Sequence, residues 1–505
     1  MQRAWTEYSS YVKYPSCNAT EGIRYPKTID DVVAIIKEAI AKKITVKAFG
    51  SRHSQTDIIC TEGIPVDMTG LQWQKMNADN TATVGAGTNL HDTTAFLRLY
   101  GRAFKTTPAF GNITIGGAIG TGAHGSTIKY NASISSQVAS VKIVDGKGEV
   151  REITDAVDLK AFKLHLGLLG VIVEVTLNTV PLYKTYAFNK IVSDDILTNG
   201  EVVQMAQNAD QMSLYWFPEF KEVVIANWTV VDANTSGTDY TNDHVPSTYD
   251  NFALVASLTK EIAFSLTDSK CSAANTLGYT ITHMMEYFLE MALVMPLPDW
   301  VPIYATQEGY FRNPSVGYYD EMIAPICQNE PQGILATACV WSHGSHSITI
   351  LDNDLELSRL GDFIKAVKKI VEKTPTSFPI QGILLRFSDN SDIYMSTAYG
   401  RQTVHFEFYL WNRDDIYNNA SGSLAGYQTI LQTLVNEFNG RSHWGKSGLV
   451  YHSSDSIDKK LDETARTNFI DVMNKYDPNG VFMNNFGRRL RRESTKIDVD
   501  PRTTR

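Results

Sequence analysis

Cysteine is scarce in this sequence and is not spaced to bind a structural metal. The 505 residues include five cysteines, and no two of them form a Cys-x-x-Cys pair. Structural zinc sites usually need such closely spaced ligands, so we expect no metal site. A disulfide between Cys17 and Cys60 would fit a secreted chain, and it would leave three cysteines buried or free.

Long apolar runs and an excess of positive charge are also missing. The most apolar long stretch, 284–304, contains two glutamates and three prolines, which argues against a membrane span and favours a helical hairpin. Contact of this stretch with a membrane surface stays open. The net charge of −9 argues against sequence-independent binding of nucleic acid. The first ten residues have no apolar core, so we expect any signal peptide to have been removed already.

Glycosylation sequons, in contrast, are frequent. Six N-x-S/T patterns occur, at Asn18, Asn112, Asn131, Asn227, Asn234 and Asn419. Because so short a pattern also arises by chance, these sequons only favour a glycoprotein of the secretory pathway, with the cytoplasm as the alternative.

The length of the chain predicts two or three domains rather than one core. Helix and strand patterns alternate through the first part, where Thr28 can cap a helix from about 30 to 43. Later, helix patterns near 357–372 and 426–438 flank strand patterns near 380–387 and 403–411. We therefore expect an α+β protein with a first domain at 1–180, a second domain with a large sheet at 181–440, and a C-terminal segment at 441–505.

Two glycine patterns resemble nucleotide-binding loops, but the sequence around each of them does not predict the strand and helix that such a loop needs. Gly117, Gly120 and Gly122 form G-x-x-G-x-G, whereas a nicotinamide-type fold needs G-x-G-x-x-G between a strand and a helix. The segment 440–447, GRSHWGKS, matches the P-loop pattern letter by letter. A helix pattern precedes it and no helix start follows it, which argues against an NTPase.

A third arrangement is a pair of loops made of small residues. The segment 50–54 follows an apolar strand pattern at 44–49 directly, and 114–125 is a second glycine-rich loop. Two such loops can wrap a pyrophosphate with backbone N–H groups and without a dedicated basic residue. His53 would then face the ring system of the bound nucleotide; its simpler interpretation is a loop histidine bonded to backbone.

Six segments make the sequence resemble a known family. They are YPKTIDDVV at 25–33, GSRHSQTDIICTEG at 50–63, TIGGAIGTGAHGS at 114–126, LGLLGVIVEVTL at 166–177, HWGK at 443–446 and DPNGVFMNNF at 477–486. Through them the chain resembles the vanillyl-alcohol-oxidase-type flavoproteins with a PCMH-type FAD-binding domain. It is most similar to their aldonolactone oxidase branch, which includes the gulonolactone oxidases and their plant relatives.

The resemblance implies a fold and a cofactor. It predicts an FAD-binding domain of two α+β subdomains, a substrate domain with a large antiparallel sheet, and a C-terminal return to the FAD domain. FAD would be bonded through its 8α carbon to His53, and by this bond alone, because 116–126 contains no cysteine. The residues implied at the cofactor are Gly50, Ser51, Arg52, His53, Ser54, Thr114, Gly116, Gly117, Gly120, Gly122, His124, Gly125, Ile172 and Lys446.

The resemblance also implies the catalytic side chains. Lys446 would hold a fixed charge near the flavin N1, with His443 beside it as a hydrogen-bond partner, although a surface lysine is the alternative. Arg386 would bind a substrate oxygen. Here the chain departs from the family, because Leu384 stands where polyol and lactone enzymes commonly have the glutamate of Glu-x-Arg. Glu407 on the neighbouring strand is the candidate replacement.

His405 shares the face of Glu407 and Tyr409 in an alternating strand, so this face is a candidate for the one toward the flavin. His405-x-Glu407 is also similar to a zinc deaminase motif, but the Pro-Cys-x-x-Cys that such enzymes need is absent.

We expect an FAD-dependent oxidoreductase that removes a hydride from a CH–OH carbon of a small aldonolactone- or polyol-like substrate. Oxygen or another acceptor would reoxidise the flavin. By the resemblance, Ala123 stands where a small side chain governs the access of oxygen to the flavin, and alanine there is compatible with a dehydrogenase or a slow oxidase. One alternative is an oxidase or dehydrogenase of an aromatic alcohol, amine or alkaloid, which the missing glutamate favours. A second is an inactive flavin-binding protein. The sequence leaves the oligomeric state open.

Overall fold

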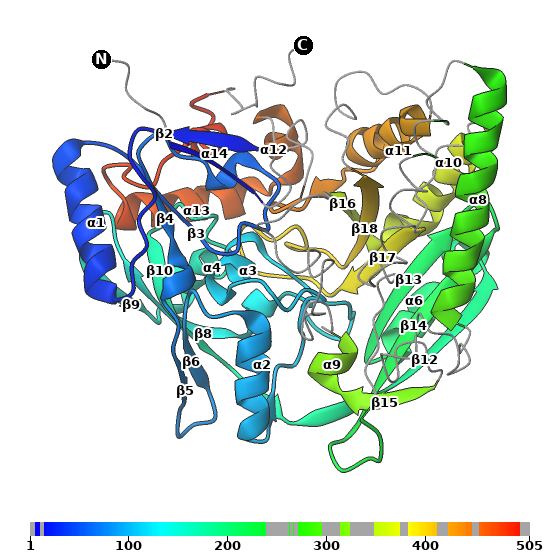
Figure 1. Ribbon diagram of the computed structural model, residues 1–505, viewed down its shortest axis with the longest axis horizontal. Coiled ribbons are helices and arrows are strands. Elements are labelled where there is room, and N and C mark those ends of the chain that lie inside the picture. Colours follow the sequence, from blue (N-terminus) through cyan, green and yellow to red (C-terminus); the bar gives the residue numbers. More distant parts are fainter. Residues whose placement is uncertain are drawn as a thin grey trace.

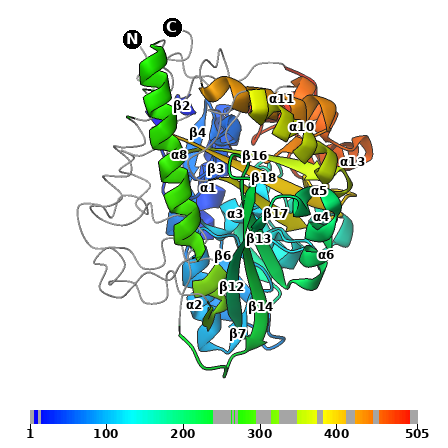
Figure 2. The same ribbon diagram turned by 90° about the vertical axis from the view of Figure 1, so that its right-hand side faces the viewer.

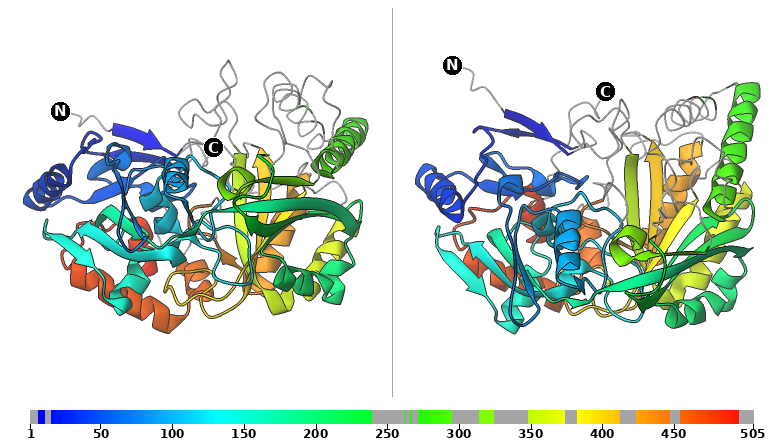
Figure 3. Two further views of the ribbon diagram at one scale, coloured as in Figure 1. Left: turned by 90° about the horizontal axis from the view of Figure 1, so that it is seen from below. Right: turned by 60° about the horizontal axis from the view of Figure 1, so that its bottom comes forward.

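The computed structural model has two halves that lie side by side (Figure 1; Figure 3). One half combines the N-terminal elements with the C-terminal helices, and the other is built around a large sheet from the middle of the chain. The structure describes residues 6–10, 15–238, 262, 266, 271–294, 314–323, 348–373, 382–411, 423–446 and 454–494.

The first half contains a five-stranded antiparallel sheet of order β5-β6-β10-β8-β9 and a parallel pair, β3 and β4. Two short antiparallel pairs, β1 with β2 and β7 with β11, flank these sheets. The elements are β1 (Thr6–Ser9), β2 (Ser16–Ala19), α1 (Ile29–Lys42), β3 (Val46–Phe49), β4 (Ile64–Asp67), β5 (Gln74–Met76), β6 (Ala82–Gly85), α2 (Leu90–Leu99), β7 (Arg102–Ala103), α3 (Ile115–Thr121), β8 (Val138–Val144), β9 (Val150–Ile153), α4 (Ala156–Phe162), β10 (Val171–Leu177) and β11 (Val180–Pro181).

Helix α1 follows directly from its sequence. Thr28 accepts a hydrogen bond from the backbone of Asp31, and the Asp31 carboxylate accepts one from the backbone of Thr28, which satisfies two N–H groups of the first turn. Val32 and Ile36 are buried on one face, in a core shared with β3 and β4. The predicted helix and its cap are confirmed.

The second half is an eight-stranded antiparallel sheet of order β15-β12-β14-β13-β17-β18-β16-β19. Helices α5, α6, α10 and α11 cover one face of this sheet, and the long helix α8 runs beside β12 and β14 (Figure 2). The elements are β12 (Tyr183–Ser193), α5 (Ile196–Asn199), α6 (Glu201–Asn208), β13 (Gln211–Phe217), β14 (Glu222–Asp232), α8 (Ser272–Val294), β15 (Ser315–Tyr318), α9 (Tyr319–Ile323), β16 (Ile348–Glu356), α10 (Leu360–Lys373), β17 (Ile383–Ser388), β18 (Thr403–Trp411), α11 (Ser423–Glu437) and β19 (Arg441–Ser442).

The two faces of this sheet differ in chemistry along β16, β17 and β18. Alternate residues such as Leu351, Leu385 and Phe406 are buried against the helices. Their neighbours, among them Arg386 and Glu407, point to the other face, toward the first half. The strand pairing therefore presents a row of buried polar side chains to the junction of the two halves.

The C-terminal segment returns to the first half through α12 (Ser454–Lys460), α13 (Glu463–Tyr476) and α14 (Asn485–Leu490). The backbone N–H of Val46 in β3 donates to Val481 at 2.8 Å. Arg489 makes a fully buried ion pair with Asp57, at 2.7 Å, in the segment that follows β3. The return thus fixes the region that carries the first glycine loop.

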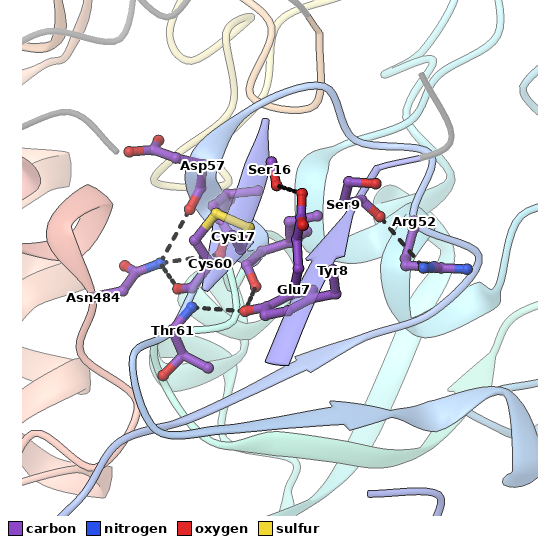
Figure 4. Close-up of a disulfide and its surroundings, with 12 residues drawn as sticks. Glu7, Tyr8, Ser9, Ser16, Cys17, Arg52, Asp57, Cys60, Thr61 and Asn484 are labelled. Carbon is purple, nitrogen blue, oxygen red and sulfur yellow. Dashed lines mark hydrogen bonds between the residues drawn. A yellow bond between two sulfur atoms is a disulfide. The ribbon is translucent and has the colours of Figure 1, made fainter. Parts of the chain in front are cut away.

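A disulfide joins Cys17 and Cys60, the pairing expected from the sequence, over a separation of 43 residues (Figure 4). It ties the β1–β2 pair to the segment that follows β3. Asn484 of the C-terminal return donates to the Cys60 carbonyl at 3.0 Å (Figure 4). Three distant parts of the chain therefore meet at one point.

The predicted α+β class with a large antiparallel sheet is confirmed. One expectation was wrong: the second glycine-rich segment is not a loop throughout, because 115–121 forms helix α3. Its glycines are accepted because α3 packs tightly, with the position of a Cβ at Gly116 only 3.0 Å from Ala86. The domain boundaries at 180 and 440 stay predictions.

The stretch 284–304 is described only in part. Its first eleven residues belong to α8, and the proposed return of the hairpin lies outside the described residues. Within the described part of the chain, none of the helices combines the length and the apolar character that crossing a membrane requires.

Candidate active site

A cavity lies where the two halves meet. Its walls come from the residues after β3, the segment around α3, the start of β10, strands β17 and β18, and the segment 443–446. It holds about 1240 Å³, including the space at its mouth. Its lining joins the glycine segments of the first half to strands β17 and β18 of the second half.

The two glycine segments touch each other on one wall. A Cβ at Gly50 would lie 1.8 Å from the hydroxyl oxygen of Thr114, and a Cβ at Gly117 would lie 3.0 Å from the same atom. Only glycine permits this approach, which brings the backbones of both segments to the cavity surface. The sequence-based pairing of these segments therefore matches their positions.

The turn after β3 places the His53 imidazole at the cavity. Arg52, just before it, has a φ of 56°, in the left-handed region that non-glycine residues rarely adopt. The His53 ring lies 4.7 Å from the ring of Phe110, centroid to centroid. The surrounding protein, and then the charge of Lys446, lower the pKa of His53 to about 3. The imidazole is therefore neutral at physiological pH.

Two buried basic residues that the sequence analysis missed also line this wall. His165 donates from Nε2 to the Gly116 carbonyl at 3.2 Å and accepts at Nδ1 from Gly167 at 2.9 Å, and burial lowers its pKa to about 4. Lys47 donates to the Leu166 and Gly167 carbonyls, and burial lowers its pKa to about 7. The sequence did contain a signal for Lys47, because it is a single lysine within the apolar strand β3.

Three charged side chains form a network where β17 and β18 meet the segment 443–446. Glu407 Oε1 lies 3.0 Å from Arg386 Nη1, and Glu407 Oε2 lies 3.3 Å from Lys446 Nζ. The Glu407 side chain is 2% exposed, so these contacts take place away from bulk water. Glu407 is the direct cross-strand partner of Leu384. A carboxylate thus lies next to the position where the sequence lacks one.

His443 is a fixed hydrogen-bonding link. Its Nδ1 accepts from the Gly445 backbone at 3.1 Å, and its Nε2 donates to the Gly122 carbonyl at 3.3 Å. Burial is the main cause that lowers its pKa to about 3, so the ring is neutral. The expected bond to the Lys446 side chain does not occur, because both ring nitrogens are engaged elsewhere. The two residues are linked by backbone, Lys446 N to His443 O, at 3.2 Å.

The segment 443–446 is held against the turn that carries His53. The Gln55 backbone donates to the Gly445 carbonyl at 2.8 Å, and the Thr56 hydroxyl donates to the Trp444 carbonyl at 2.9 Å. This arrangement also excludes the P-loop interpretation. Within the matching motif, Arg441–Ser442 form the edge strand β19, and Lys446 reaches a carboxylate of the same cavity.

The structure brings most of the predicted site residues to this one cavity. They are Gly50, Ser51, Arg52, His53, Ser54, Thr114, Gly116, Gly117, Gly120, His124, Ile172, Arg386, Glu407, His443 and Lys446. Gly122 and Gly125 do not line it. Gly122 ends α3 with a φ of 78°, and a Cβ at Gly125 would lie 2.5 Å from the Thr106 hydroxyl. These two glycines shape the path of the chain instead.

His405 is also absent from the cavity lining. It lies behind His124, with the two rings stacked at 3.8 Å between centroids. Of the strand face that was a candidate for facing the flavin, Glu407 does line the cavity. His405 lies in the layer behind the cavity wall. The side chain of Tyr409 is outside the described part.

Two family models match the chain. That of an FAD binding domain matches residues 20–154, and that of D-arabinono-1,4-lactone oxidase matches residues 348–490. The first range includes the turn with His53 and the α3 segment. The second includes all three members of the charged network.

Whole-length relatives match as well. An L-gulono-1,4-lactone dehydrogenase of Mycobacterium tuberculosis is 24% identical, covering 94% of this chain and 96% of the relative. A probable L-gulonolactone oxidase 6 of Arabidopsis thaliana is 26% identical, covering 94% and 80%. The L-gulonolactone oxidase of Mus musculus is 24% identical, covering 95% and 97%. Among solved structures, cholesterol oxidase from Brevibacterium sterolicum shares the fold, with a TM-score of 0.67 at 15% identity over 96% of this chain and 97% of that one.

Proposed function

We propose that this chain is an FAD-dependent aldonolactone oxidoreductase, which oxidises a CH–OH carbon of a small aldonolactone- or polyol-like substrate. The observation that carries the proposal is the position of Glu407. Its carboxylate is paired with Arg386 and Lys446 in the cavity that the glycine segments also line. A polar group that recognises hydroxyls thus shares one cavity with the segments suited to the cofactor.

The glycine wall fits FAD. A Cβ at Gly50 would collide with Thr114, so the backbone itself forms this surface, as the close approach of a pyrophosphate requires. We place the covalent bond to the 8α carbon at His53, whose neutral imidazole lies in the same wall. When bound, FAD supplies the acceptor for the two electrons that leave the substrate carbon as hydride.

Acid precipitation tests the covalent bond. We expect the yellow colour of the purified protein to stay with the pellet, because a covalent bond survives unfolding. In His53→Ala the colour should move to the supernatant. Native protein that releases its flavin into the supernatant would remove the proposed role of His53 while leaving FAD binding intact.

On the substrate side, the charged network binds and orients the hydroxyl. Arg386 presents a fixed fork of donors to a substrate oxygen. Glu407 accepts the hydrogen bond of the hydroxyl that is oxidised and receives its proton at Oε2. Lys446 and Arg386 offset the negative charge that develops on the oxygen as this proton leaves. His443 positions the segment that carries Lys446 through its bond to Gly122.

A substrate panel with an artificial electron acceptor tests the substrate class. We expect turnover of L-gulono-1,4-lactone or a polyol at a kcat/KM above that of aromatic alcohols and amines. Hydrogen peroxide formation, measured in parallel under air, separates an oxidase from a dehydrogenase. Turnover of aromatic alcohols or amines alone would contradict the proposed class, and flavin that no substrate reduces would favour an inactive flavin-binding protein.

One observation supports a second candidate, the oxidation of a less polar specialised metabolite. Leu384 is fully buried in a cluster with Tyr215, Phe217 and Ile350, directly beside Glu407 on the sheet. An aldonolactone carries several hydroxyls that need hydrogen-bond acceptors, and Leu384 supplies none at the position where the family commonly has the glutamate of Glu-x-Arg. The same substrate panel decides between the two.

We also place the protein in the secretory pathway. A disulfide such as Cys17–Cys60 persists in oxidising compartments, and the sequon residues Asn18 and Asn234 are exposed. Digestion of the native protein with an endoglycosidase should lower its apparent mass. A chain isolated from its source cell without glycan and with reduced Cys17 would contradict this placement.

A further inference from the structure

A second buried polar cluster lies behind the candidate active site, on the same face of the large sheet. Asp352 and Asp354 alternate along β16, and His405 lies on β18 directly opposite Asp354. Asp352 is the cross-strand partner of Glu407. The three residues are at most 2% exposed, and neither the proposed catalysis nor the binding of FAD uses them.

The cluster has the geometry of a ligand set. Asp352, Asp354 and His405 each offer one ligand atom, and these atoms lie within 4.8 Å of one another. Carboxylate and imidazole ligands lie about 2.0–2.2 Å from Zn²⁺, so the ligands of one ion are at most about 4.4 Å apart. Small side-chain rotations are therefore sufficient to close the set around a cation.

Polar atoms in the cluster lack hydrogen-bond partners within the described part of the chain. This holds for both carboxylate oxygens of Asp352 and for Nε2 of His405. Nε2 of His124 lies 3.6 Å from Asp352 Oδ2, which is too long for a hydrogen bond. Nδ1 of His405 is hydrogen-bonded to Asp354 Oδ1 at 2.5 Å. In either tautomer of the ring, Nε2 is therefore the nitrogen without a hydrogen-bond partner.

The two negative charges of the cluster also favour a bound cation. Two carboxylates this close repel each other unless a proton or a cation lies between them. The guanidinium of Arg386 is paired with Glu407, and that of Arg401 donates to the Asp354 backbone carbonyl rather than to its carboxylate. A divalent cation would neutralise both carboxylates at once and use the open positions on His405 and Asp352.

We propose that Asp352, Asp354 and His405 bind one divalent transition-metal cation, Zn²⁺ or a close analogue, which fastens β16 to β18 behind Glu407. The imidazole ligand favours this class over Mg²⁺ and Ca²⁺, which select oxygen ligands. His124 is then the outer partner of Asp352, and its ring, stacked on His405, fixes the ligand orientation. The site is independent of which substrate the enzyme oxidises.

Metal analysis of the flavin-loaded full-length protein tests the proposal. The protein is stripped with a chelator, dialysed against Zn²⁺ and freed of excess ion before the zinc-to-flavin ratio is measured. We expect about one Zn²⁺ per chain in the native protein, and at least a tenfold lower ratio in Asp354→Asn/His405→Gln. The matched control Asp210→Asn/His91→Gln, which changes the same residue types away from the cluster, should keep the full ratio.

X-ray absorption of the zinc-loaded native protein provides a test that needs no variant to fold. The proposal predicts oxygen and nitrogen ligands, including one imidazole, and no sulfur. If the native protein retains no Zn²⁺, the proposal is overturned, and a proton shared between the two carboxylates is the remaining explanation of the cluster. Retained Zn²⁺ with sulfur ligands, or an unchanged ratio in Asp354→Asn/His405→Gln, would overturn it equally.

Discussion

At the scale of single residues, the substrate side of the site depends on one carboxylate. Glu407 contacts Arg386 at 3.0 Å and Lys446 at 3.3 Å, in a place that water reaches poorly. Removing its charge leaves two cations that face each other without compensation. The proton acceptor and the electrostatic centre of the network would be lost together.

We therefore predict that Glu407→Gln lowers kcat/KM by about 10²- to 10⁴-fold, the usual contribution of general acid–base catalysis. Flavin content should not change, because Glu407 belongs to strand β18 and not to the glycine segments. The control Glu152→Gln, at an exposed position of β9, should behave as native. Steady-state kinetics with flavin quantified in each preparation provides the measurement. A Glu407→Gln enzyme within about threefold of native would refute this role.

The cross-strand pair of Leu384 and Glu407 allows the carboxylate to be moved. Leu384→Glu/Glu407→Leu returns it to the position of Glu-x-Arg, two residues before Arg386 and on the same face. We predict that this double variant recovers at least about tenfold in kcat/KM over Glu407→Leu alone. Equal activity of the two variants would show that the carboxylate acts only from β18.

Lys47 provides a pH-dependent prediction, because burial lowers its pKa from 10.5 to about 7. Between these values the unfolded chain binds a proton that the folded protein does not, so stability rises with pH in this window. Lys47→Met removes this term. The free energy of unfolding of native protein relative to the variant should therefore increase from pH 7 to pH 10, by up to roughly 3–5 kcal/mol. Denaturant titrations at matched flavin content measure the difference, and a flat profile would contradict the burial of a neutral lysine.

At the scale of elements, sequence patterns predicted what is governed locally. The Thr28 cap and the apolar face of α1 are determined within one helix, and strands β8 and β10 show buried, β-branched runs. Helix α3 was missed because glycines argue against a helix, and their acceptance depends on contacts with Ala86 and His165 that are distant in sequence. The helical conformation of α3 therefore depends on tertiary packing rather than on the intrinsic helix propensity of its residues.

The Cys17–Cys60 disulfide links the β1–β2 pair to the segment after β3, and the effect of its removal on stability can be measured directly. It closes 43 residues, for which chain entropy predicts a stabilisation of about 4 kcal/mol. We predict that Cys17→Ser/Cys60→Ser lowers the free energy of unfolding by about this amount, whereas Cys271→Ser at an exposed position has little effect. Urea unfolding followed by circular dichroism gives both values. A loss below about 1 kcal/mol would mean that the Asp57–Arg489 pair and Asn484 hold this region without the disulfide.

At the scale of the whole molecule, the site assembles from segments that meet only after folding. The cofactor wall was largely predictable, because His53 and the glycines lie in short motifs whose order along the chain matches the family. The charged network was predictable residue by residue, but its pairing depends on the register of β17 with β18. The Asp352–Asp354–His405 cluster was not predictable, since 51 residues separate Asp354 from His405 and no spacing pattern marks them.

In the proposed reaction, a hydroxylated substrate bound at Arg386, Glu407 and Lys446 delivers a hydride to FAD held at His53. This hydride transfer is measured by anaerobic mixing of the purified flavoprotein with L-gulono-1,4-lactone, followed by visible absorbance. We predict bleaching of the oxidised flavin in native protein and at least hundredfold slower bleaching in Glu407→Gln. Flavin that dithionite reduces, but that lactones and polyols leave oxidised, would contradict the claim.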